Sequence, residues 1–390
     1  MNQGVENIPE NLPPELAQYL KDARGIKPAE SNIVELQSAW EQYLHNLNTL
    51  IPDISVLDSG EVVYLGKLSA GCQACKDGTW DCIFITMRCN LACEFCYSPY
   101  AIEDNFIGSV FGSEPEQIAQ KYEKIPIQGV SFSGGEPFLE RTRLFDWISF
   151  FTSSFPEKYF WVYTNGLLVT KDDIDHLCKL GIDEIRFNVA ATGYNNPLVM
   201  DNISYAASLI HHVTIEIPSI PEHRGLVLEN LAEWDRLGVH YLNLHELIYE
   251  PNTNSASMAG TRRSFVNTDG HYSQFNPQSR LLTLEVMQRV TEEDLTISVN
   301  DCSMQSKLRQ LRNRRRNIST FEMQSYEKFV GGDSYVTCCA YLGESFFFFH
   351  PDRLDKIRDS HPDHQLIRLS RTAPLSFQEQ PRWSFIEIIQ

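Results

Sequence analysis

Short apolar runs alternate with amphipathic stretches along the middle of the chain. Six runs are rich in β-branched and aromatic residues, as is typical of buried strands: DCIFIT, GVSFS, YFWVYT, EIRF, VTIEI and HYLNL. Five stretches between them have apolar residues at helical spacing, over 114–123, 141–153, 171–180, 198–210 and 226–237. Such alternation requires a parallel sheet with right-handed crossovers. Six units are too few to close an eight-stranded barrel, so the pattern predicts an α/β protein with a partial (β/α)6 TIM-type barrel over residues 82–250.

The segments on either side of this barrel have different patterns. Residues 1–81 are predicted to form an N-terminal helical extension that ends in a hairpin, because PPELAQYLKDA and NIVELQSAWEQYLHNL have helical spacing and SVLDSGEVVYLG contains a turn. Residues 251–279 are rich in Asn, Ser, Thr and Gly, which predicts a long loop at the barrel rim that contacts substrate. Together with the residues that follow, this loop forms a predicted C-terminal α+β extension over 251–390.

Charge and composition argue against several classes of protein. The 390 residues carry a net charge of −18, whereas proteins that bind nucleic acid broadly have a basic excess. A local basic cluster from Lys307 to Arg316 is interpreted as a solvated or acid-paired surface, with an anchor for an acidic peptide as the alternative. No apolar run is long enough to span a bilayer, and the N-terminus lacks the regions of a signal peptide. We therefore expect a cytoplasmic protein that binds neither nucleic acid nor membrane.

Three cysteines follow the first predicted strand. Cys89, Cys93 and Cys96, in CNLACEFCYSP, offer three thiolates, which hold three corners of a four-iron cluster and leave the fourth iron open to a small molecule. A fourth cysteine ligand would make a closed electron carrier, so three ligands indicate an enzyme. A structural zinc knuckle is the alternative, but it needs a fourth Cys or His nearby and is more usual in small domains.

Polar groups gather at the ends of the later strands. Gly134 and Gly135 let the backbone approach a ligand closely, and Glu136 beside them offers a carboxylate to an ammonium group. The ends of the next strands carry Thr164, Asn165, Arg186, Asn188, Glu216 and His245. Because the carboxyl ends of parallel strands share one edge of a barrel, these groups are expected at one site. For the polar residues on the last three of these strands, hydrogen bonding in the barrel interior or around the site is the alternative.

The C-x3-C-x-aromatic-C loop, followed by a Gly-Gly-Glu turn, resembles the radical S-adenosylmethionine (radical SAM) superfamily. The resemblance implies that the three cysteines hold a [4Fe-4S] cluster whose open iron binds the amino and carboxylate groups of S-adenosyl-L-methionine (SAM). One electron then breaks the sulfonium C–S bond, which gives a 5′-deoxyadenosyl radical. The resemblance also implies that the turn with Glu136 holds the methionyl amine and that polar groups near Arg186 touch the cofactor. Thr164 and Asn165 suit ribose hydroxyls, and Phe95 in the loop is expected to lean on a planar ligand.

Further cysteines lie before and after the barrel. The C-x2-C pair of Cys72 and Cys75 is half of a metal site and is a poor candidate for a disulfide inside a cell. An upstream GCxxC paired with a later cysteine, here Cys302, that precedes a Lys- and Arg-rich segment resembles a subgroup labelled as related to activating enzymes of glycyl radical proteins. We expect Cys72, Cys75 and Cys302 to meet and to hold a second cluster or a zinc ion. The candidates for a fourth ligand are Cys82, Cys338 and Cys339.

The adjacent Cys338 and Cys339 also have a competing interpretation. Some peptide epimerases of this superfamily quench a substrate carbon radical with a cysteine thiol, so that donation of a hydrogen atom is the alternative to metal binding. Neighbouring residues of a regular element point in different directions, and the two roles are therefore compatible.

The extra cysteines, the long loop and the N-terminal extension suit a bulky, flexible substrate. The leading hypothesis is a maturase that modifies a ribosomally made peptide (RiPP) by hydrogen abstraction, with epimerisation, a cross-link or backbone cleavage as the outcome. A small-molecule radical SAM enzyme and an activase that generates a glycyl radical on a partner protein are alternatives. A non-enzymatic Fe-S or zinc scaffold that binds a peptide is the alternative of another class. An electron donor such as flavodoxin or ferredoxin is implied, and the sequence sets no oligomeric state.

Overall fold

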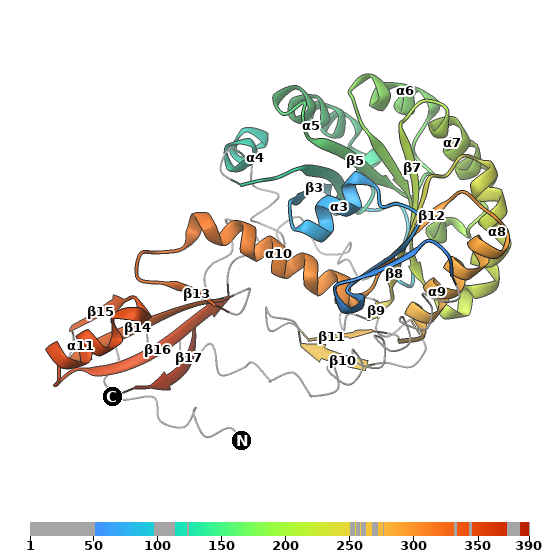
Figure 1. The fold of residues 1–390 in the computed structure, drawn as a ribbon. Coiled ribbons are helices and arrows are strands. Elements are labelled where there is room, and N and C mark those ends of the chain that lie inside the picture. The colour runs from blue at the N-terminus through green and yellow to red at the C-terminus, as the bar shows by residue number, and fades with distance from the viewer. Residues whose placement is uncertain are drawn as a thin grey trace. The chain divides into compact units, whose positions relative to one another are not determined.

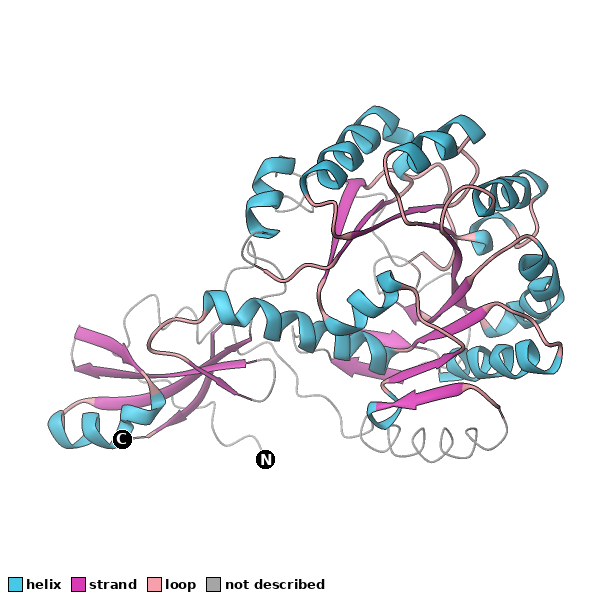
Figure 2. Cartoon of the chain, turned by 45° about the horizontal axis from the view of Figure 1, so that its top comes forward, coloured by secondary structure: helices cyan, strands magenta, loops and turns pink. Residues whose placement is uncertain are grey.

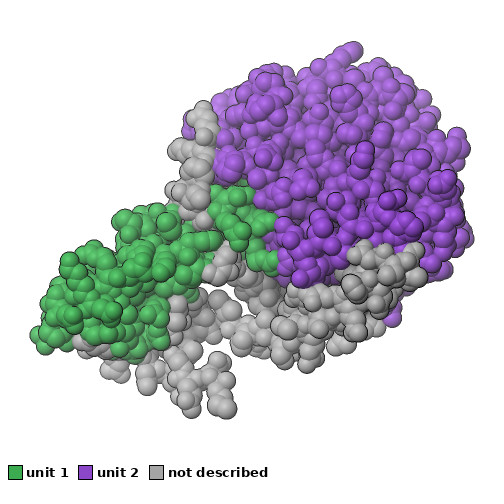
Figure 3. Space-filling view, viewed as in Figure 1, with its two compact units in different colours: residues 1–28, 266–271, 311–390 green, residues 29–265, 272–310 purple. Residues whose placement is uncertain are grey.

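The chain divides into two compact units (Figure 3). Unit 2 comprises residues 29–265 and 272–310, and unit 1 comprises residues 1–28, 266–271 and 311–390. The computed structural model describes residues 51–96, 114–122, 125–249, 254, 258, 263–266, 272–275, 277–330, 334–342, 345–372 and 383–389. The two helices predicted before residue 50 lie outside these described residues.

Unit 2 is built on a nine-stranded sheet in the order β1-β2-β12-β8-β7-β6-β5-β4-β3 (Figure 1). The six predicted strands are β3 (Trp80–Thr86), β4 (Gly129–Gly134), β5 (Tyr159–Thr164), β6 (Glu184–Phe187), β7 (His212–Ser219) and β8 (Tyr241–Glu246). Each pairs with the next in parallel. The predicted parallel barrel is thereby confirmed, and the carboxyl ends of these strands form its mouth.

Five helices connect these strands and cover the outer face of the sheet (Figures 1 and 2). They are α4 (Pro115–Tyr122), α5 (Arg141–Ser154), α6 (Lys171–Lys179), α7 (Pro197–Ala207) and α8 (Arg224–Arg236). Local sequence sets where they begin. Thr170 and Asp173 form a capping box at the start of α6, and Asn196 caps α7, whose first residue is proline.

The sheet extends beyond the six predicted strands, which corrects the predicted end of the barrel at residue 250. After α9 (Pro277–Glu292), strand β12 (Ser298–Cys302) pairs in parallel with β8. The predicted hairpin, β1 (Ile54–Leu57) and β2 (Val62–Leu65), then joins antiparallel to β12. The sequence of β12, SVNDC, has few apolar residues, and polar side chains surround it in the barrel interior. The hydrophobic pattern of the chain therefore did not predict a strand here.

Helix α3 (Ala70–Asp77), which carries Cys72 and Cys75, packs against the inner side of the barrel. A Cβ at Gly71 would lie 2.6 Å from Nη2 of Arg186, and one at Gly129 would lie 2.8 Å from the ring of Trp161. Glycine at these two positions lets the helix and the start of β4 approach the barrel floor. The GCxxC segment therefore belongs to the barrel interior rather than to a separate extension.

The segment predicted as a rim loop also contains strands. Strands β10 (Arg263–Val266) and β11 (Tyr272–Phe275) form a small sheet with β9 (Ile248–Tyr249), in the order β10-β11-β9. Other residues of this segment lie outside the described part of the chain. The loop prediction for 251–279 is therefore wrong where β10, β11 and the start of α9 occur.

Unit 1 contains the predicted α+β extension. Its sheet has the order β13-β14-β16-β17, and β15 also pairs with β14. The strands are β13 (Lys328–Val330), β14 (Ser334–Leu342), β15 (Ser345–Phe349), β16 (Gln365–Thr372) and β17 (Trp383–Ile388), and α11 (Leu354–Ser360) lies between β15 and β16. Helix α10 (Met304–Glu322) begins in unit 2 and ends in unit 1. None of the described helices is long and apolar enough to cross a membrane.

Arg280 links β12 to the elements around it. Its guanidinium, with a side chain that is 1% exposed, donates to Asp301 on β12 at 2.8 Å, to Gln305 on α10 at 2.6 Å and to the carbonyl of Gly60 beside the hairpin at 2.7 Å. One buried cation thus joins α9, β12, α10 and the hairpin. Because both charges of the pair with Asp301 are buried, loss of either leaves the other unpaired.

Replacing Arg280 by Met is expected to destabilise unit 2 by about 3–5 kcal/mol, because the carboxylate of Asp301 stays buried without its cation. Urea unfolding followed by circular dichroism measures the loss. Arg289→Met on the same helix is the matched control, since that side chain is exposed and pairs with Glu292 and Glu293 at the surface. The control is expected to lose less than about 1 kcal/mol. Equal losses in the two variants would contradict this role for Arg280.

Candidate active site

The three-cysteine loop begins where β3 ends at the barrel mouth. Cys89, Cys93 and Cys96 are partly buried free thiols, and the amide of Cys96 donates to the carbonyl of Cys93 at 3.0 Å. Burial, together with the neighbouring Cys96 and Cys89, raises the pKa of Cys93 to about 11. The charges of Cys96 and Cys89 thus act on Cys93. The three thiols do not converge on a single metal ion, and in a bound cluster each would ligate a separate iron.

The Gly-Gly-Glu turn after β4 supports the start of this loop. The amide of Gly135 donates to the carbonyl of Thr86, and the amide of Glu136 donates to the carbonyl of Arg88, each at 2.8 Å. A Cβ at Gly134 would clash with the Thr86 carbonyl oxygen, and a Cβ at Gly135 would clash with that of Arg88. Gly134 also has a φ of +136°, which other residues rarely adopt. The glycines are required because the backbone leading to the cysteines lies directly against the turn.

The carboxylate of Glu136 is fully buried and faces donors of the protein. It accepts hydrogen bonds from the hydroxyl of Thr164 at 2.9 Å and from the backbone amides of Asn165 at 2.8 Å and Phe138 at 3.2 Å. Burial raises its pKa, although these donors oppose the shift. Glu136 and Thr164 thus bind each other in the structure. Their predicted contacts with a methionyl amine and a ribose stay predictions.

Asn165 connects this turn to the cysteine loop. Its side-chain amide donates to Oδ1 of Asn90 at 2.7 Å and lies 4.0 Å from Sγ of Cys89. Its backbone amide is one of the donors to Glu136. Asn165 therefore links the turn to the residues beside Cys89, and its predicted contact with a ribose stays a prediction. The contribution of Asn90 was missed, and its place beside a cysteine in CNLAC was the one available signal.

Phe95 and Asn254 fix the other end of the loop. The Phe95 ring packs against an apolar cluster at the strand ends, formed by Ile220, Leu247, Tyr249 and Met258. The Phe95 carbonyl accepts a hydrogen bond of 2.9 Å from Asn254, which also donates to the carbonyl of Ile248 at 2.7 Å. The aromatic ring that was expected to lean on a planar ligand thus anchors the loop to the rim. Asn254 lies in the polar segment predicted as a loop, and no motif marked it.

The side chains of Arg186 and Asn188 make contacts within the protein. The guanidinium of Arg186 is 2% exposed and contacts Glu184 at 2.8 Å and Glu216 at 2.7 Å inside the barrel. The side chain of Asn188 accepts a hydrogen bond from the amide of Ala191 at 3.2 Å and caps the turn after β6. The alternative interpretation, hydrogen bonding inside the barrel or around the site, describes the observed contacts of both residues. Their predicted contact with a cofactor stays a prediction.

Glu216, His245 and Cys302 form a second polar group on the neighbouring strands β7, β8 and β12. Nε2 of His245 lies 2.7 Å from Oε1 of Glu216, and Cys302 is the register partner of His245 on the next strand. Burial would lower the pKa of His245, but Cys302 and Glu216 raise it to about 9. Burial would raise the pKa of Glu216, but Arg186 and His245 hold it well below its usual range. Glu216 therefore favours the protonated form of His245, and His245 favours the ionised form of Glu216.

The other cysteines of the predicted second metal site lie in the same interior. The thiol of Cys72 is 3.3 Å from Oδ1 of Asn243. Burial raises the pKa of Cys75 well above its ordinary value, and the charges of Cys72 and Cys302 add to this shift against the effect of Arg186. Cys82 lies on β3, where burial raises its pKa to about 12. Among the described residues, no three or more His, Cys, Asp or Glu are arranged to hold a single metal ion, and the second site stays a prediction.

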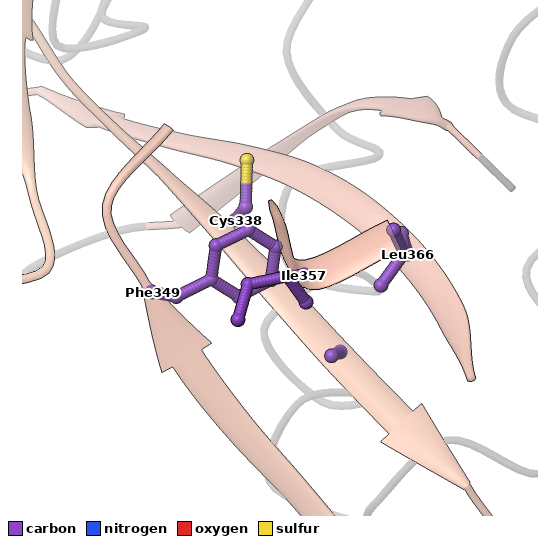
Figure 4. Packing of buried hydrophobic residues seen from close by; sticks show 5 residues of the cluster. Cys338, Phe349, Ile357 and Leu366 are labelled. Carbon is purple, nitrogen blue, oxygen red and sulfur yellow. The ribbon is translucent and has the colours of Figure 1, made fainter. Parts of the chain in front are cut away.

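Cys338 and Cys339 belong to unit 1, where both are fully buried on β14. Cys338 packs in an apolar cluster with Phe349, Ile357 and Leu366 (Figure 4). Burial raises the pKa of both thiols, that of Cys339 to about 12. These are the surroundings of packing residues. Their predicted roles as metal ligands or hydrogen-atom donors stay predictions.

The parallel barrel and its three-cysteine loop define a class of protein that a family comparison identifies. Residues 83–222 match the family model described as the Radical SAM superfamily. The matched residues run from β3 through the cysteine loop and the Gly-Gly-Glu turn to the end of β7. Residues 83–222 of the chain are therefore similar to a radical SAM domain, as the cysteine loop and the Gly-Gly-Glu turn predicted.

Individual relatives match only parts of the chain. A protein of Methanocaldococcus jannaschii, named for the glycyl-radical enzyme activating enzymes, is 24% identical over 192 residues, which are 46% of this chain and 50% of that protein. Streptococcus suis SuiB bound to SAM is 12% identical with a TM-score of 0.45, over 58% of this chain and 50% of SuiB. Coproporphyrinogen III oxidase (HemN) from Escherichia coli is 13% identical with a TM-score of 0.37, over 88% of this chain and 79% of HemN. The chain thus spans about half the length of the first two.

Glu246 ends β8 beside the second polar group and is 4% exposed. Its Oε2 accepts a hydrogen bond of 2.7 Å from the amide of Met304, the first residue of α10. Burial raises the pKa of this carboxyl to about 7. The folded protein therefore holds the Glu246 proton more tightly than the unfolded chain does.

Glu246 is expected to make the stability of unit 2 depend on pH. An unfolded Glu has a pKa of about 4.3, so the contribution of the bound proton is complete below about pH 4.3 and is lost as the pH rises through about 7. Glu246→Gln keeps an acceptor for Met304 and should gain about 3 kcal/mol relative to the wild type across this interval. Urea unfolding at several pH values measures the difference, and exposed Glu222→Gln is the control. A difference that does not change with pH would refute the assignment.

Proposed function

We propose that this protein is a radical SAM enzyme in which Cys89, Cys93 and Cys96 hold a [4Fe-4S] cluster and the barrel mouth binds SAM. When bound, the cluster supplies the electron that cleaves SAM to a 5′-deoxyadenosyl radical, which abstracts a hydrogen atom from the substrate. One observation carries the proposal. Three cysteines with C-x3-C-x2-C spacing lie on the loop after β3 at the mouth of a parallel barrel, within residues that match the radical SAM family model.

The residues around the loop support this function by fixing the three sulfurs. The start of the loop is hydrogen bonded to the Gly-Gly-Glu turn, its middle to Asn165, and its end to Asn254 through the carbonyl of Phe95. Ligands held at several points lose little conformational freedom on binding metal. The amide of Asn165 near Sγ of Cys89 is also suited to tune a bound cluster, because hydrogen bonds to ligand sulfurs shift its reduction potential.

The barrel floor supports the same function by limiting the approach of water. Trp161 is fully buried near the start of β5, and α3 packs against it through Gly71. The charges inside are paired, because Arg186 contacts both Glu184 and Glu216. A radical generated at the mouth would therefore face a filled, water-poor interior on one side and its substrate on the other.

The proposed substrate is a polypeptide, with a ribosomally made peptide as the leading case and flavodoxin or ferredoxin as the class of electron donor. The additional cysteines and the elaborated segments before and after the six predicted barrel units support a bulky substrate. An activase of a glycyl radical enzyme is the second candidate, because the M. jannaschii relative carries that name. A new mass in a peptide encoded beside the gene would favour the first, and a glycyl radical signal on a partner protein the second.

Cys93→Ala is expected to abolish formation of 5′-deoxyadenosine, because two thiolates do not hold the cluster in place of three. The assay uses protein reconstituted anaerobically with iron and sulfide, then reduced with dithionite in the presence of SAM. Cys178→Ala is the matched control and should leave the rate unchanged, since Cys178 is exposed on α6. If wild-type protein with an intact, reducible cluster forms no 5′-deoxyadenosine, the proposed function is wrong and a non-enzymatic scaffold is favoured.

Gly135→Ala is expected to lower the iron bound after reconstitution to less than about half, because its Cβ would displace the Arg88 carbonyl and the loop beyond it. Gly225→Ala is the control, since the nearest atom to its Cβ, at 3.9 Å, is the end of the Glu229 side chain. About four iron atoms per wild-type chain are expected for one cluster, and about eight would support a second. A Gly135→Ala variant with the iron content of the wild type would show that the Gly-Gly-Glu turn is not needed to position the cysteine loop.

A further inference from the structure

The last of the three cysteines is held by a residue that lies far from it in the sequence. Asn254, in the segment between β9 and β10, is 1% exposed. Its side-chain nitrogen donates to the carbonyl of Phe95 at 2.9 Å and to the carbonyl of Ile248 at 2.7 Å. The Phe95 carbonyl belongs to the peptide group that joins Phe95 to Cys96. Asn254 therefore acts directly on the backbone that carries Cys96.

The amide of the same peptide group is also held. It belongs to Cys96 and donates to the carbonyl of Cys93 at 3.0 Å. Because a peptide group is planar, a hydrogen bond to its carbonyl and another from its amide together fix its orientation. That orientation limits the φ angle of Cys96 and so the direction of its side chain. Asn254 thus helps to place the Cys96 sulfur relative to Cys93.

The two partners of Asn254 define the chemistry that this position requires. Carbonyl oxygens only accept hydrogen bonds, so the atom between these two has to supply two hydrogens. The NH2 group of asparagine does so from a single nitrogen, and the two acceptors fix which end of the side chain is nitrogen. Because Asn254 is buried, a side chain without donors would leave both carbonyls unsatisfied.

The segment that carries Asn254 is itself anchored to the barrel rim. The amide of Met258 donates to the carbonyl of Asn254 at 3.1 Å, and Met258 belongs to the apolar cluster against which Phe95 packs. Ile248, the second acceptor, pairs with Phe275 on β11. The hydrogen bond to Phe95 therefore connects the cysteine loop to the small sheet after β8.

We propose that Asn254 is a positioning residue for the cluster, because through the Phe95 carbonyl it orients Cys96, the third ligand. It thereby makes the cluster site depend on the rim segment that follows β8. Residues that hold a metal ligand in place contribute to metal affinity without touching the metal. Asn254 lies beyond residue 222, where the match to the radical SAM family model ends. The inference rests on the proposed function, since it takes Cys96 as a ligand of the cluster.

Two substitutions of Asn254 separate hydrogen bonding from packing. Asn254→Leu has a similar volume and no donor, whereas Asn254→Ser is smaller and keeps one donor. Iron is therefore expected to leave Asn254→Leu at least about tenfold faster than the wild type, with Asn254→Ser between the two. The measurement is the rate at which anaerobically reconstituted protein loses iron to a chelator. Asn230→Leu is the matched control and should keep the wild-type rate, because the hydrogen bond of Asn230 to a carbonyl on α8 is exposed.

A second readout requires no metal. Hydrogen exchange in the reduced apoprotein is followed by mass spectrometry in the peptide that contains Cys93 and Cys96. Asn254→Leu should exchange the Cys96 amide at least about tenfold faster than the wild type, because the peptide group has lost one of its two hydrogen bonds. Asn230→Leu should exchange at the wild-type rate. The peptide that spans β5 is the internal reference for folding and should not change.

Equal rates of iron loss and of exchange in Asn254→Leu and the wild type would overturn the proposal. Faster iron loss from Asn254→Ser than from Asn254→Leu would also overturn it, because that order indicates packing rather than hydrogen bonding. Wild-type protein that binds a cluster and cleaves SAM, with an Asn254→Leu variant that behaves identically, refutes the role of Asn254 alone. Wild-type protein that takes up no iron on reconstitution refutes the proposed function and, with it, a role of Asn254 towards a cluster, even where the difference in exchange is found.

Discussion

Two amide-to-carbonyl hydrogen bonds hold the candidate site together. They run from Gly135 and Glu136 in the turn after β4 to Thr86 and Arg88 at the end of β3. Each of these hydrogen bonds contributes roughly 1 kcal/mol net to folding stability. Their geometry determines the position of the cysteine loop and of the Glu136 carboxylate. The close approach requires glycine at 134 and 135. It also places the Glu136 carboxylate where the end of β5 closes over it through Thr164 and Asn165.

A chain of polar contacts extends from this pair of hydrogen bonds to the cysteines. Glu136 binds Asn165, Asn165 binds Asn90, and Asn90 precedes the rest of the cysteine loop. Glu136 is buried, so a substitution that removes one of its hydrogen-bond donors leaves an unsatisfied carboxylate oxygen. The loss of folding free energy then exceeds the contribution of the hydrogen bond itself. The same residues that resemble a ligand-binding motif are thus needed to shape the loop. The motif has a structural function whether or not its side chains also touch SAM.

The barrel holds two groups of candidate residues. The cysteine loop contacts the ends of β4 and β5 at its start and, through Phe95, the residues after β7 and β8 at its end, whereas Glu216, His245 and Cys302 lie on β7, β8 and β12. Arg186 on β6 lies between them, and its charge fixes Glu216 as a carboxylate.

The sequence predicted the features that depend on local patterns. Apolar runs located β3 to β8, helical spacing located α4 to α8, and cysteine spacing identified the loop. It did not predict β12, because this strand has polar residues and pairs with a strand more than fifty positions earlier in the chain. It also did not predict that α3 packs inside the barrel, because this packing depends on the contacts of Gly71 with Trp161 and Arg186. Phe95, Glu136 and Arg186 were predicted at the site, but their partners are set by tertiary contacts. The local sequence around a carboxylate is the same whether that carboxylate binds a ligand or accepts hydrogen bonds from a neighbouring strand.

An open iron at the cysteine loop is the central requirement of the proposed function. The most direct test is the electron paramagnetic resonance spectrum of the reduced cluster with and without SAM. A SAM molecule that ligates the open iron changes the electronic environment of the cluster. We therefore predict a shift in the g values on addition of SAM, and no shift with 5′-deoxyadenosine, which lacks the amino and carboxylate groups that would bind the open iron. A spectrum of the intact cluster that SAM leaves unchanged would contradict it.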